Sequence, residues 1–208
     1  MSRPREFEEG AVLDTVSEQF WAKGYAGTSM DSIAAATGLG KGSLYGAFGG
    51  KQKLFLRVLD AYCYRVADAV AEELSGPDEE AYARLSAHIR LAAAEVAADS
   101  RHRGCLLAKG AAELSEHEPE VTARSRRTLE RIASALAENI RGAQRHGDID
   151  QAADADRLAS LVLAVLRGVE ALGKAGTDAS QLEGIAETAI DLFPRASSAS
   201  VNRDPASI

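Results

Sequence analysis

Hydrophobic positions recur every three or four residues along most of the chain, and polar positions fill the gaps between them. This spacing is typical of amphipathic α-helices, whereas half-buried strands alternate with a period of two. In the first such segment, 6–23, Val12, Val16 and Phe20 share one face, and Gly24 follows as a helix stop signal. The pattern predicts an all-α protein with about nine helices.

Two short helices are predicted to follow the first. The second begins with a capping-box-like pair, Thr28 and Asp31, and ends at Gly38, which permits a sharp turn. Residues 40–42 are expected to form a tight connection into a third helix over 43–48. Three short helices, with a sharp turn before the last, are the parts of a helix-turn-helix reader of DNA.

The rest of the chain contains longer amphipathic segments. We predict helices over 51–74, 79–98, 106–116, 119–145, 153–174 and 179–193. The predicted organisation is a helix-turn-helix domain over 1–50, a larger helical domain over 51–194, and a tail over 195–208. The tail is rich in Ser, Ala and polar residues, has little to bury, and is predicted to be disordered.

The charge distribution changes how the net charge is interpreted. A formal net charge of −7 argues against nucleic-acid binding, because phosphate contacts need Lys and Arg. Residues 1–53, however, hold 6 basic and 6 acidic side chains, so this segment carries no net charge. The acidity therefore belongs to the remainder of the chain and leaves the helix-turn-helix free to bind DNA.

Other features exclude several classes of protein. Cys63 and Cys105 lie far apart, and no signal-like segment precedes them, so we expect a cytoplasmic protein without a disulfide framework. The longest apolar stretch, 158–166, is shorter than the roughly 20 residues of a membrane span. The sequence has no GxSxG, HExxH or strand-linked GxGxxG motif. We therefore predict no catalytic residues, no cofactor, no metal and no membrane partner.

A set of residues at fixed spacing in the first quarter of the chain resembles the TetR/AcrR family of one-component repressors. The residues that carry the resemblance are Gly24, Tyr25, Thr28, Ser29, Met30, Ile33, Ala34, Gly38, Lys41, Gly42, Ser43, Leu44, Tyr45, Phe48, Lys51, Leu54 and Phe55. The resemblance implies a homodimer of all-α subunits, a three-helix DNA-binding domain, and a C-terminal domain with a ligand cavity. It also implies dimerisation through the last two helices.

By that resemblance, six residues stand where the family contacts a double-stranded DNA operator: Thr28, Lys41, Gly42, Ser43, Tyr45 and Lys51. Thr28, Tyr45 and Lys51 are expected on phosphates, whereas Lys41 and Ser43 are candidates for base edges. The alternative for the charged and hydroxyl residues is an ordinary solvated surface.

Two small residues, Gly46 and Ala47, stand where relatives often place bulkier side chains. Base reading is therefore expected to be sparse and to depend more on Lys41, on Arg3 or on the shape of the DNA. Arg3 and Arg5 are either an arm on the DNA or a free terminus.

The segments 153–174 and 179–193 carry more apolar residues than a single buried stripe needs. A second copy can cover this excess in a four-helix interface around a two-fold axis. Packing within one chain is the alternative. The predicted interface residues are Leu158, Leu161, Val165, Val169, Leu172, Ile185, Ala189 and Phe193. Two-fold symmetry predicts a palindromic operator with half-sites roughly 34 Å, or a multiple of that, apart.

The ligand cavity that the resemblance implies lies among the middle helices and holds a small-molecule inducer of unknown identity. Candidate lining residues are Tyr62, Leu85, His88, Cys105, Lys109 and Glu113. An inducer acts only if it binds the DNA-incompetent geometry better. The resemblance, not the spacing, implies that it does so by tilting the helix over 51–74.

Cys105 supplies an alternative signal. It lies at a predicted helix start, with Arg103 before it and Lys109 one turn later, and both the helix dipole and these cations favour a thiolate. A regulator that senses oxidants or electrophiles through Cys105 is therefore one alternative, and a buried, inert Cys105 is another. A metal site with His102, Glu113 and His117 lacks a recognisable ligand pattern. An architectural DNA binder without an effector is the remaining alternative.

Overall fold

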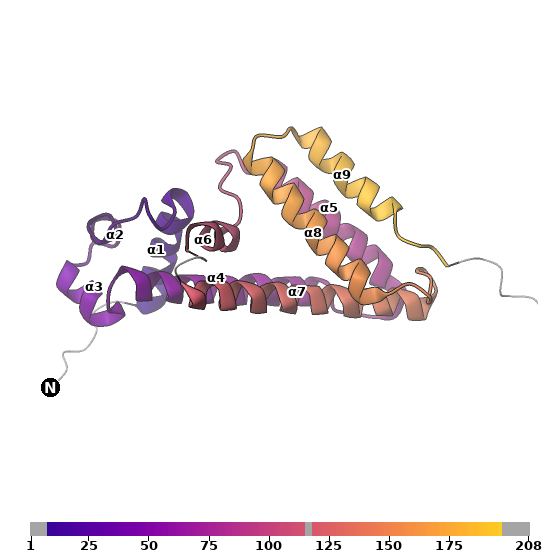
Figure 1. Cartoon of the computed structure of the whole chain (residues 1–208), viewed down its shortest axis with the longest axis horizontal. Helices are drawn as coiled ribbons and strands as arrows, with labels where there is room; N and C mark the ends of the chain where they lie inside the picture. The colour runs from indigo at the N-terminus through magenta and orange to yellow at the C-terminus, as the bar shows by residue number, and fades with distance from the viewer. Residues whose placement is uncertain (1–7, 115–117, 197–208) are drawn as a thin grey trace, which may run out of the picture. The chain divides into compact units, whose positions relative to one another are not determined.

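The structure is a computed structural model that describes residues 8–114 and 118–196. In these residues the chain forms nine α-helices, one short 3₁₀ helix and a single antiparallel bridge between Ile149 and Arg195. The fold is therefore all-α, as the hydrophobic spacing predicts (Figure 1). In the described residues, no helix combines the length and the apolar composition that a bilayer span needs.

The chain divides into two compact units. Unit 1 contains the described residues up to Ala69 together with Arg101–Glu130, and unit 2 contains Val70–Ser100 together with the described residues from Arg131 onward. Two long helices, α4 (Lys51–Glu73) and α7 (Pro119–His146), contribute residues to both units. The predicted domain boundaries of 1–50, 51–194 and 195–208 stay predictions, and most of the tail lies outside the described residues.

Unit 1 contains the short helices at the start of the chain. These are α1 (Glu9–Lys23), α2 (Met30–Thr37) and α3 (Lys41–Phe48), and α6 (Leu106–Leu114) joins them together with parts of α4 and α7. Gly24 ends α1 with a φ of 73°, in the left-handed region that favours glycine.

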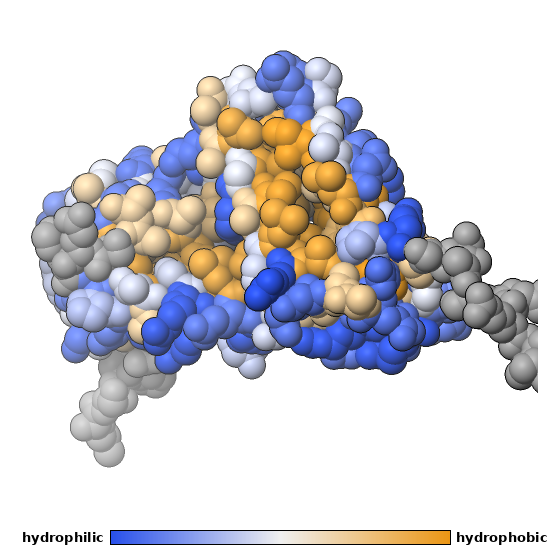
Figure 2. All heavy atoms as spheres, turned by 45° about the vertical axis from the view of Figure 1, so that its right-hand side comes forward, coloured by the Kyte–Doolittle hydropathy of each residue, from blue (hydrophilic) through white to orange (hydrophobic). Residues whose placement is uncertain are grey.

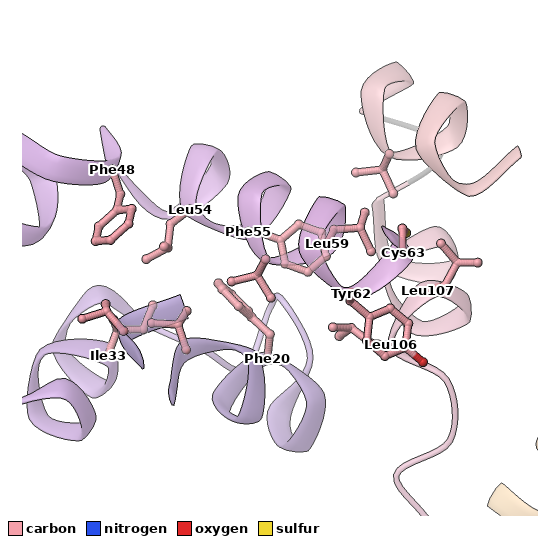
Figure 3. Close-up of a cluster of buried hydrophobic side chains, with 14 of the residues drawn as sticks. Phe20, Ile33, Phe48, Leu54, Phe55, Leu59, Tyr62, Cys63, Leu106 and Leu107 are labelled. Atoms are coloured by element: carbon pink, nitrogen blue, oxygen red, sulfur yellow. The ribbon is translucent and has the colours of Figure 1, made fainter. Parts of the chain in front are cut away.

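A single apolar core holds unit 1 together (Figure 3). Phe20 of α1 is fully buried, and its ring lies 5.0 Å from that of Phe55 of α4 in an edge-to-face arrangement. Ile33 of α2 and Leu44 of α3 are also fully buried. Each short helix therefore contributes at least one large side chain to a shared core, and burial of such a side chain is worth about 1.5–3 kcal/mol.

Unit 2 is built around α5 (Ala81–Ala98), which follows the 3₁₀ helix η1 (Asp78–Glu80). Helices α8 (Ala155–Lys174) and α9 (Ala179–Asp191) pack on α5 and on each other (Figure 1). Gly173 of α8 is required for this packing, because a Cβ there would overlap the side chain of Val96 of α5. The acidic N-caps Asp154 and Asp178 accept backbone N–H bonds at the starts of α8 and α9.

The helix starts and ends differ from the predictions in a few places. Ser29, not Thr28, is the N-cap of α2, and it forms a reciprocal capping box with Ser32. Helix α3 begins at Lys41 after Gly40 as N-cap, so the prediction of a connection over 40–42 was wrong by two residues. Helix α9 ends at Asp191, two residues earlier than predicted.

Candidate nucleic-acid interface

Helices α2 and α3 meet at a sharp turn. Gly38, the C-cap of α2, has a φ of 69° in the left-handed region, which lets the chain reverse within a few residues. Leu44 and Phe48 bury one side of α3 against α1, α2 and α4, and Phe48 is only 3% exposed. One face of α3 is thus fixed by the core, and the opposite face is left to solvent.

The exposed face of α3 carries small and polar residues. Lys41, Gly42, Ser43, Tyr45 and Gly46 are all exposed, and the Tyr45 side chain is 53% exposed. Hydroxyl, ammonium and bare backbone N–H groups are the donors that proteins commonly place on DNA phosphates and base edges. The structure therefore brings together four of the six predicted DNA-contact residues on a single helix.

The two glycines of this face have no packing role within the described residues. Gly42 and Gly46 lie four positions apart in α3, and a Cβ at either would meet no described atom within 4 Å. A helical glycine costs about 1 kcal/mol relative to alanine. Without side chains at these two positions, the backbone of α3 is open to close approach by another molecule.

Lys41 is held by an acidic residue of the preceding helix. Its ammonium forms an ion pair with the carboxylate of Asp31 in α2, and both side chains are more than half exposed. The hydrogen bond to Asp31 raises the pKa of the Lys41 ammonium above its ordinary value. Lys41 is therefore charged at neutral pH, and Asp31 competes with an anionic partner for its ammonium.

Lys51 stands at the start of α4. Its ammonium lies 4.2 Å from the centroid of the Tyr25 ring, and the side chain is half-buried. Burial raises the pKa of the Tyr25 hydroxyl above its ordinary value. The cation–π contact orients the Lys51 side chain beside the core, so that its position is set before any phosphate binds.

Thr28 has a different position from the other predicted contact residues. Its side chain is buried, at 1% exposure, and its hydroxyl donates to the carbonyl oxygens of Gly24 at 2.7 Å and Gln19 at 3.2 Å. The hydroxyl thus satisfies carbonyls at the end of α1, and its donor is not available to a phosphate. Arg3 and Arg5, the predicted arm, lie outside the described residues.

The predicted effector residues fall in both units. Tyr62, Cys105, Lys109 and Glu113 belong to unit 1, and Leu85 and His88 belong to unit 2. In unit 2, Leu85 is fully buried, and the ring of His88 lies 2.6 Å from a carboxylate oxygen of Glu73. Because these residues belong to two separate compact units, it stays a prediction that they line one shared cavity.

Two charged effector candidates make contacts inside unit 1. The Lys109 ammonium donates to the carbonyl of Trp21 at 2.6 Å, and a Glu113 carboxylate oxygen accepts from the backbone N–H of Ala26 at 2.9 Å. Trp21 in turn donates its ring N–H to the carbonyl of Gly104 at 2.6 Å. These bonds attach α6 to the end of α1, a role that the spacing of charges along α6 did not indicate.

Cys105 is buried beside an aromatic side chain. It is 9% exposed, and the Tyr62 hydroxyl donates to its sulfur at 3.6 Å. Burial raises the pKa of the nearby thiol of Cys63, which favours its protonated form. Redox sensing through Cys105 stays a prediction. In the described part of the chain, no group of three or more His, Cys, Asp or Glu residues is placed to hold a metal ion, and His117 lies outside it.

The outer surfaces of α8 and α9 form an apolar groove made of two adjoining hollows (Figure 2). The larger, of about 680 Å³, is lined by residues that include Leu172 and Leu192, and the smaller is lined by residues that include Leu158 and Leu161. Leu161 and Leu172 are 55% and 41% exposed, and Leu192, which the prediction omitted, is 70% exposed. Four further predicted residues are half-buried: Leu158, Val165, Ile185 and Ala189. Val169 and Phe193, by contrast, are buried within unit 2. Most of the predicted interface residues thus lie on one exposed apolar surface.

Two family models match the sequence. The description of the first is "Bacterial regulatory proteins, tetR family", and it matches residues 12–58. The second, "Tetracyclin repressor-like, C-terminal domain", matches residues 81–189. The two matches together cover the helix-turn-helix and most of the helices that follow it.

Several transcriptional regulators resemble the chain, two of them over most of its length. The HTH-type transcriptional repressor ComR of Escherichia coli is 27% identical over 92% of this chain and 91% of its own length. The HTH-type transcriptional activator FasR of Mycolicibacterium smegmatis is 35% identical, over 34% of this chain and 32% of its own. A cysteine variant of the TetR family regulator CifR, solved with 26-bp operator DNA, is 25% identical with a TM-score of 0.79. That alignment covers 93% of this chain and 100% of the CifR chain.

Proposed function

The chain belongs to the TetR family of DNA-binding transcriptional regulators, and on that premise we propose that it is a dimeric repressor released by a small molecule. The exposed face of α3 carries the DNA-binding part of this proposal, and release by a small molecule is carried over from the family. Lys41, Ser43 and Tyr45 surround two glycines that have no packing role in the described residues. We place these residues and Lys51 on the operator, and we leave Thr28 out because its hydroxyl is used within α1.

Lys41 has the central role at this surface. When the protein binds DNA, its ammonium exchanges Asp31 for a base edge or a phosphate. Tyr45 and Lys51 donate to phosphates on either side, and the bare backbone at Gly42 lets the helix approach closely. The recognition helix thereby enters the major groove with its exposed face toward the bases.

Repression, rather than activation, is supported by the extent of the similarities. The similarity to ComR, named as a repressor, covers 92% of the chain, whereas the similarity to the activator FasR covers 34%. Repression requires only that the bound protein blocks the promoter. No activating contact with another protein is needed for this role.

The homodimer is supported by the apolar groove of α8 and α9. Monomeric proteins rarely expose contiguous apolar patches of this kind without a partner. A second copy that places its own α8 and α9 in the groove buries Leu161, Leu172 and Leu192 and sets the distance between two recognition helices. The operator is then palindromic, because the two helices are related by the two-fold axis.

A titration on DNA tests the proposal. Labelled DNA from upstream of the gene is titrated with the full chain by fluorescence anisotropy at several salt concentrations, with an unrelated duplex as control. We expect saturable binding at least 10³-fold tighter than to the unrelated duplex, which weakens steeply with salt. Equal binding to both duplexes contradicts the proposal for this promoter. A search of genomic fragments by selection then decides whether any specific site exists.

A further inference from the structure

Unit 2 contains a cavity of about 270 Å³ at the turn between α4 and α5. None of the residues predicted to bind an effector lines it. Its apolar wall comes from Ala71, Leu74, Ala81 and Ala135, and its charged wall comes from Asp78, Arg84, Glu138 and Arg145. The charged wall holds two cations and two anions and is therefore neutral overall.

Asn139 is one of the residues that line this cavity, and its side chain holds a buried acceptor. The residue is only 4% exposed, and its amide N–H donates to the carbonyl of Leu74 at 3.0 Å. That bond fixes the amide so that Oδ1 is the remaining atom, and Oδ1 is buried with no hydrogen-bond partner in the described residues. A buried acceptor left in this state costs about 1–3 kcal/mol, so Oδ1 calls for a donor that the described part of the chain does not supply.

Arg84 presents the complementary group. Its side chain is 16% exposed, and its Nε and Nη1 are buried without a hydrogen-bond partner among the described residues. The nearest carboxylate oxygen of Glu80 lies 3.7 Å from Nη1, beyond hydrogen-bond distance, and the Glu80 side chain is 66% exposed. The guanidinium therefore keeps unused donors next to the cavity, and a carboxylate is the group that a guanidinium binds best.

The guanidinium of Arg145, in the same wall, does have hydrogen-bond partners. It donates to Asp78 at 2.7 and 2.9 Å and to Glu138 at 3.3 Å. These bonds lower the pKa of the Asp78 carboxyl below its ordinary value. Asp78 and Arg145 thus neutralise each other, which leaves Arg84 as the cation with unused donors.

Two glycines lie so close to the charged wall that a side chain at either position would overlap it. A Cβ at Gly76 would lie 2.8 Å from Nη1 of Arg84, and one at Gly142 would lie 2.9 Å from Oδ1 of Asp78. Gly76 also has a φ of 141°, which other residues rarely adopt. The backbone at these positions is therefore shaped so that the charged side chains can occupy the edge of the cavity.

We propose that this cavity binds a small aliphatic α-amino acid. The carboxylate pairs with Arg84, and the ammonium donates to Oδ1 of Asn139 and faces Glu138. The side chain lies against the alanines and Leu74. A zwitterion satisfies both unpaired groups of a neutral wall, whereas a simple carboxylate leaves Asn139 unsatisfied and a simple amine leaves Arg84 unsatisfied. The volume equals that of roughly nine waters, which is space for an amino acid of valine or leucine size.

The cavity is also placed to affect α4. Ala71 lies in the last turn of this helix and Leu74 directly follows it, and both line the cavity. The same helix begins at Lys51 in unit 1. Release of the operator by the bound amino acid depends on the proposed function. Binding of the amino acid does not depend on it.

Calorimetry on the DNA-free full chain tests the binding. The probes are L-valine, L-leucine, 4-methylpentanoate, which lacks the amino group, and 3-methylbutylamine, which lacks the carboxylate. We expect one site per chain for L-valine or L-leucine and at least tenfold weaker binding of the other two probes. Failure of both amino acids to bind, or equal binding of leucine and 4-methylpentanoate, overturns the proposal.

Two arginines of α5 give a matched pair of variants. Arg84→Met keeps the length of the side chain and should abolish amino-acid binding. It should change the thermal midpoint of the DNA-free protein little, because Nε and Nη1 have no hydrogen-bond partner among the described residues and the ion pair with Glu80 is long and mostly exposed on the Glu80 side. Arg90→Met removes an exposed arginine that is paired with Glu187 and should retain binding. Full binding by Arg84→Met overturns the proposal. If this variant does not fold, the comparison of leucine with 4-methylpentanoate on the unmodified chain still decides.

A separate titration links the cavity to the operator. Leucine or valine added to the operator complex should lower its affinity at least tenfold, and it should have no effect on Arg84→Met. Binding without release contradicts the effector role alone, and a protein that binds no operator contradicts the proposed function alone.

Discussion

The exposed face of α3 and the groove of α8 and α9 are both surfaces that their own unit leaves uncovered, yet they are built from opposite residues. Glycines, a lysine and hydroxyl groups line the first, and leucines and other apolar side chains line the second. A polar face suits a partner that binds reversibly and with an affinity that depends on the salt concentration. An apolar groove suits a permanent partner, because its free energy comes from water released by apolar surface.

The two surfaces also differ in how a charge should affect them. A carboxylate introduced in the apolar groove is buried in both copies of a dimer, without a counter-charge, and this costs several kcal/mol. At α3 a single charge changes a contact that stays partly exposed to solvent, so its effect is smaller. We therefore expect a carboxylate in the groove to weaken operator binding more than a substitution on α3 does.

Leu161→Glu should have the largest effect. It places two carboxylates in the proposed dimer interface, so we expect monomers at micromolar concentration and at least 100-fold weaker operator binding. Sedimentation velocity and anisotropy measure the two effects. Leu91→Glu is the matched control, since Leu91 is 47% exposed on α5 outside the groove. If Leu161→Glu stays dimeric, the groove is not the interface.

Gly42→Leu should separate stability from binding. Leucine in place of a helical glycine should stabilise the protein by about 1 kcal/mol, and nothing described lies within 4 Å of its Cβ. The same side chain keeps α3 away from the DNA backbone, so we expect at least tenfold weaker operator binding. Urea unfolding measures the expected gain in stability, and fluorescence anisotropy measures the expected loss of operator affinity. Unchanged affinity would show that DNA does not approach α3 at Gly42.

Lys41→Ala should have an intermediate effect. Loss of a base or phosphate contact is expected to weaken operator binding about 5–20-fold, corresponding to roughly 1–2 kcal/mol. If Lys41 contacts a phosphate, the slope of log K against log salt also falls by about one. Arg126→Ala, which removes an exposed arginine of α7, should change neither quantity. Equal effects of the two variants would mean that only net charge matters.

Asp31→Asn should have the smallest effect on operator affinity, and it should raise the affinity where the other three variants lower it. The variant removes the carboxylate that competes for Lys41 and repels phosphate, so we expect about 2–4-fold tighter operator binding. The gain should shrink at high salt and vanish in the Lys41→Ala background, which a double-mutant cycle measures. A loss of affinity would mean that Asp31 positions Lys41 for binding.

Most of the fold could be predicted from the sequence, because each helix buries one apolar face at the regular spacing of an α-helix. The starts of the short helices could not. Thr28 and Ser29 are adjacent hydroxyl residues, and the choice of cap depends on which one turns inward to the carbonyl of Gly24. Helix α3 began earlier than expected because Gly40, a residue with no side chain, acts as its N-cap.

The candidate sites were predictable to different degrees. The resemblance placed Lys41, Ser43 and Tyr45 on the DNA-facing side of the third helix, and the structure shows that they are exposed on α3. Their contacts with DNA stay a prediction. The spacing of apolar residues in α8 shows a wide apolar surface, but it cannot show that Val169 is buried within unit 2 while Leu161 stays exposed. Whether Nε of Arg84 and Oδ1 of Asn139 find hydrogen-bond partners depends on tertiary neighbours, so no sequence pattern could have indicated that they lack them in the described residues.

Hydroxyl-radical footprinting of the operator complex tests the central claim most directly, namely that a two-fold dimer places two α3 helices in the major groove. The account predicts two symmetric protected regions centred about 34 Å apart, or a multiple of it, on a palindromic sequence. Both regions should weaken together in Leu161→Glu. A single asymmetric protected region, or two regions that respond independently, would contradict it.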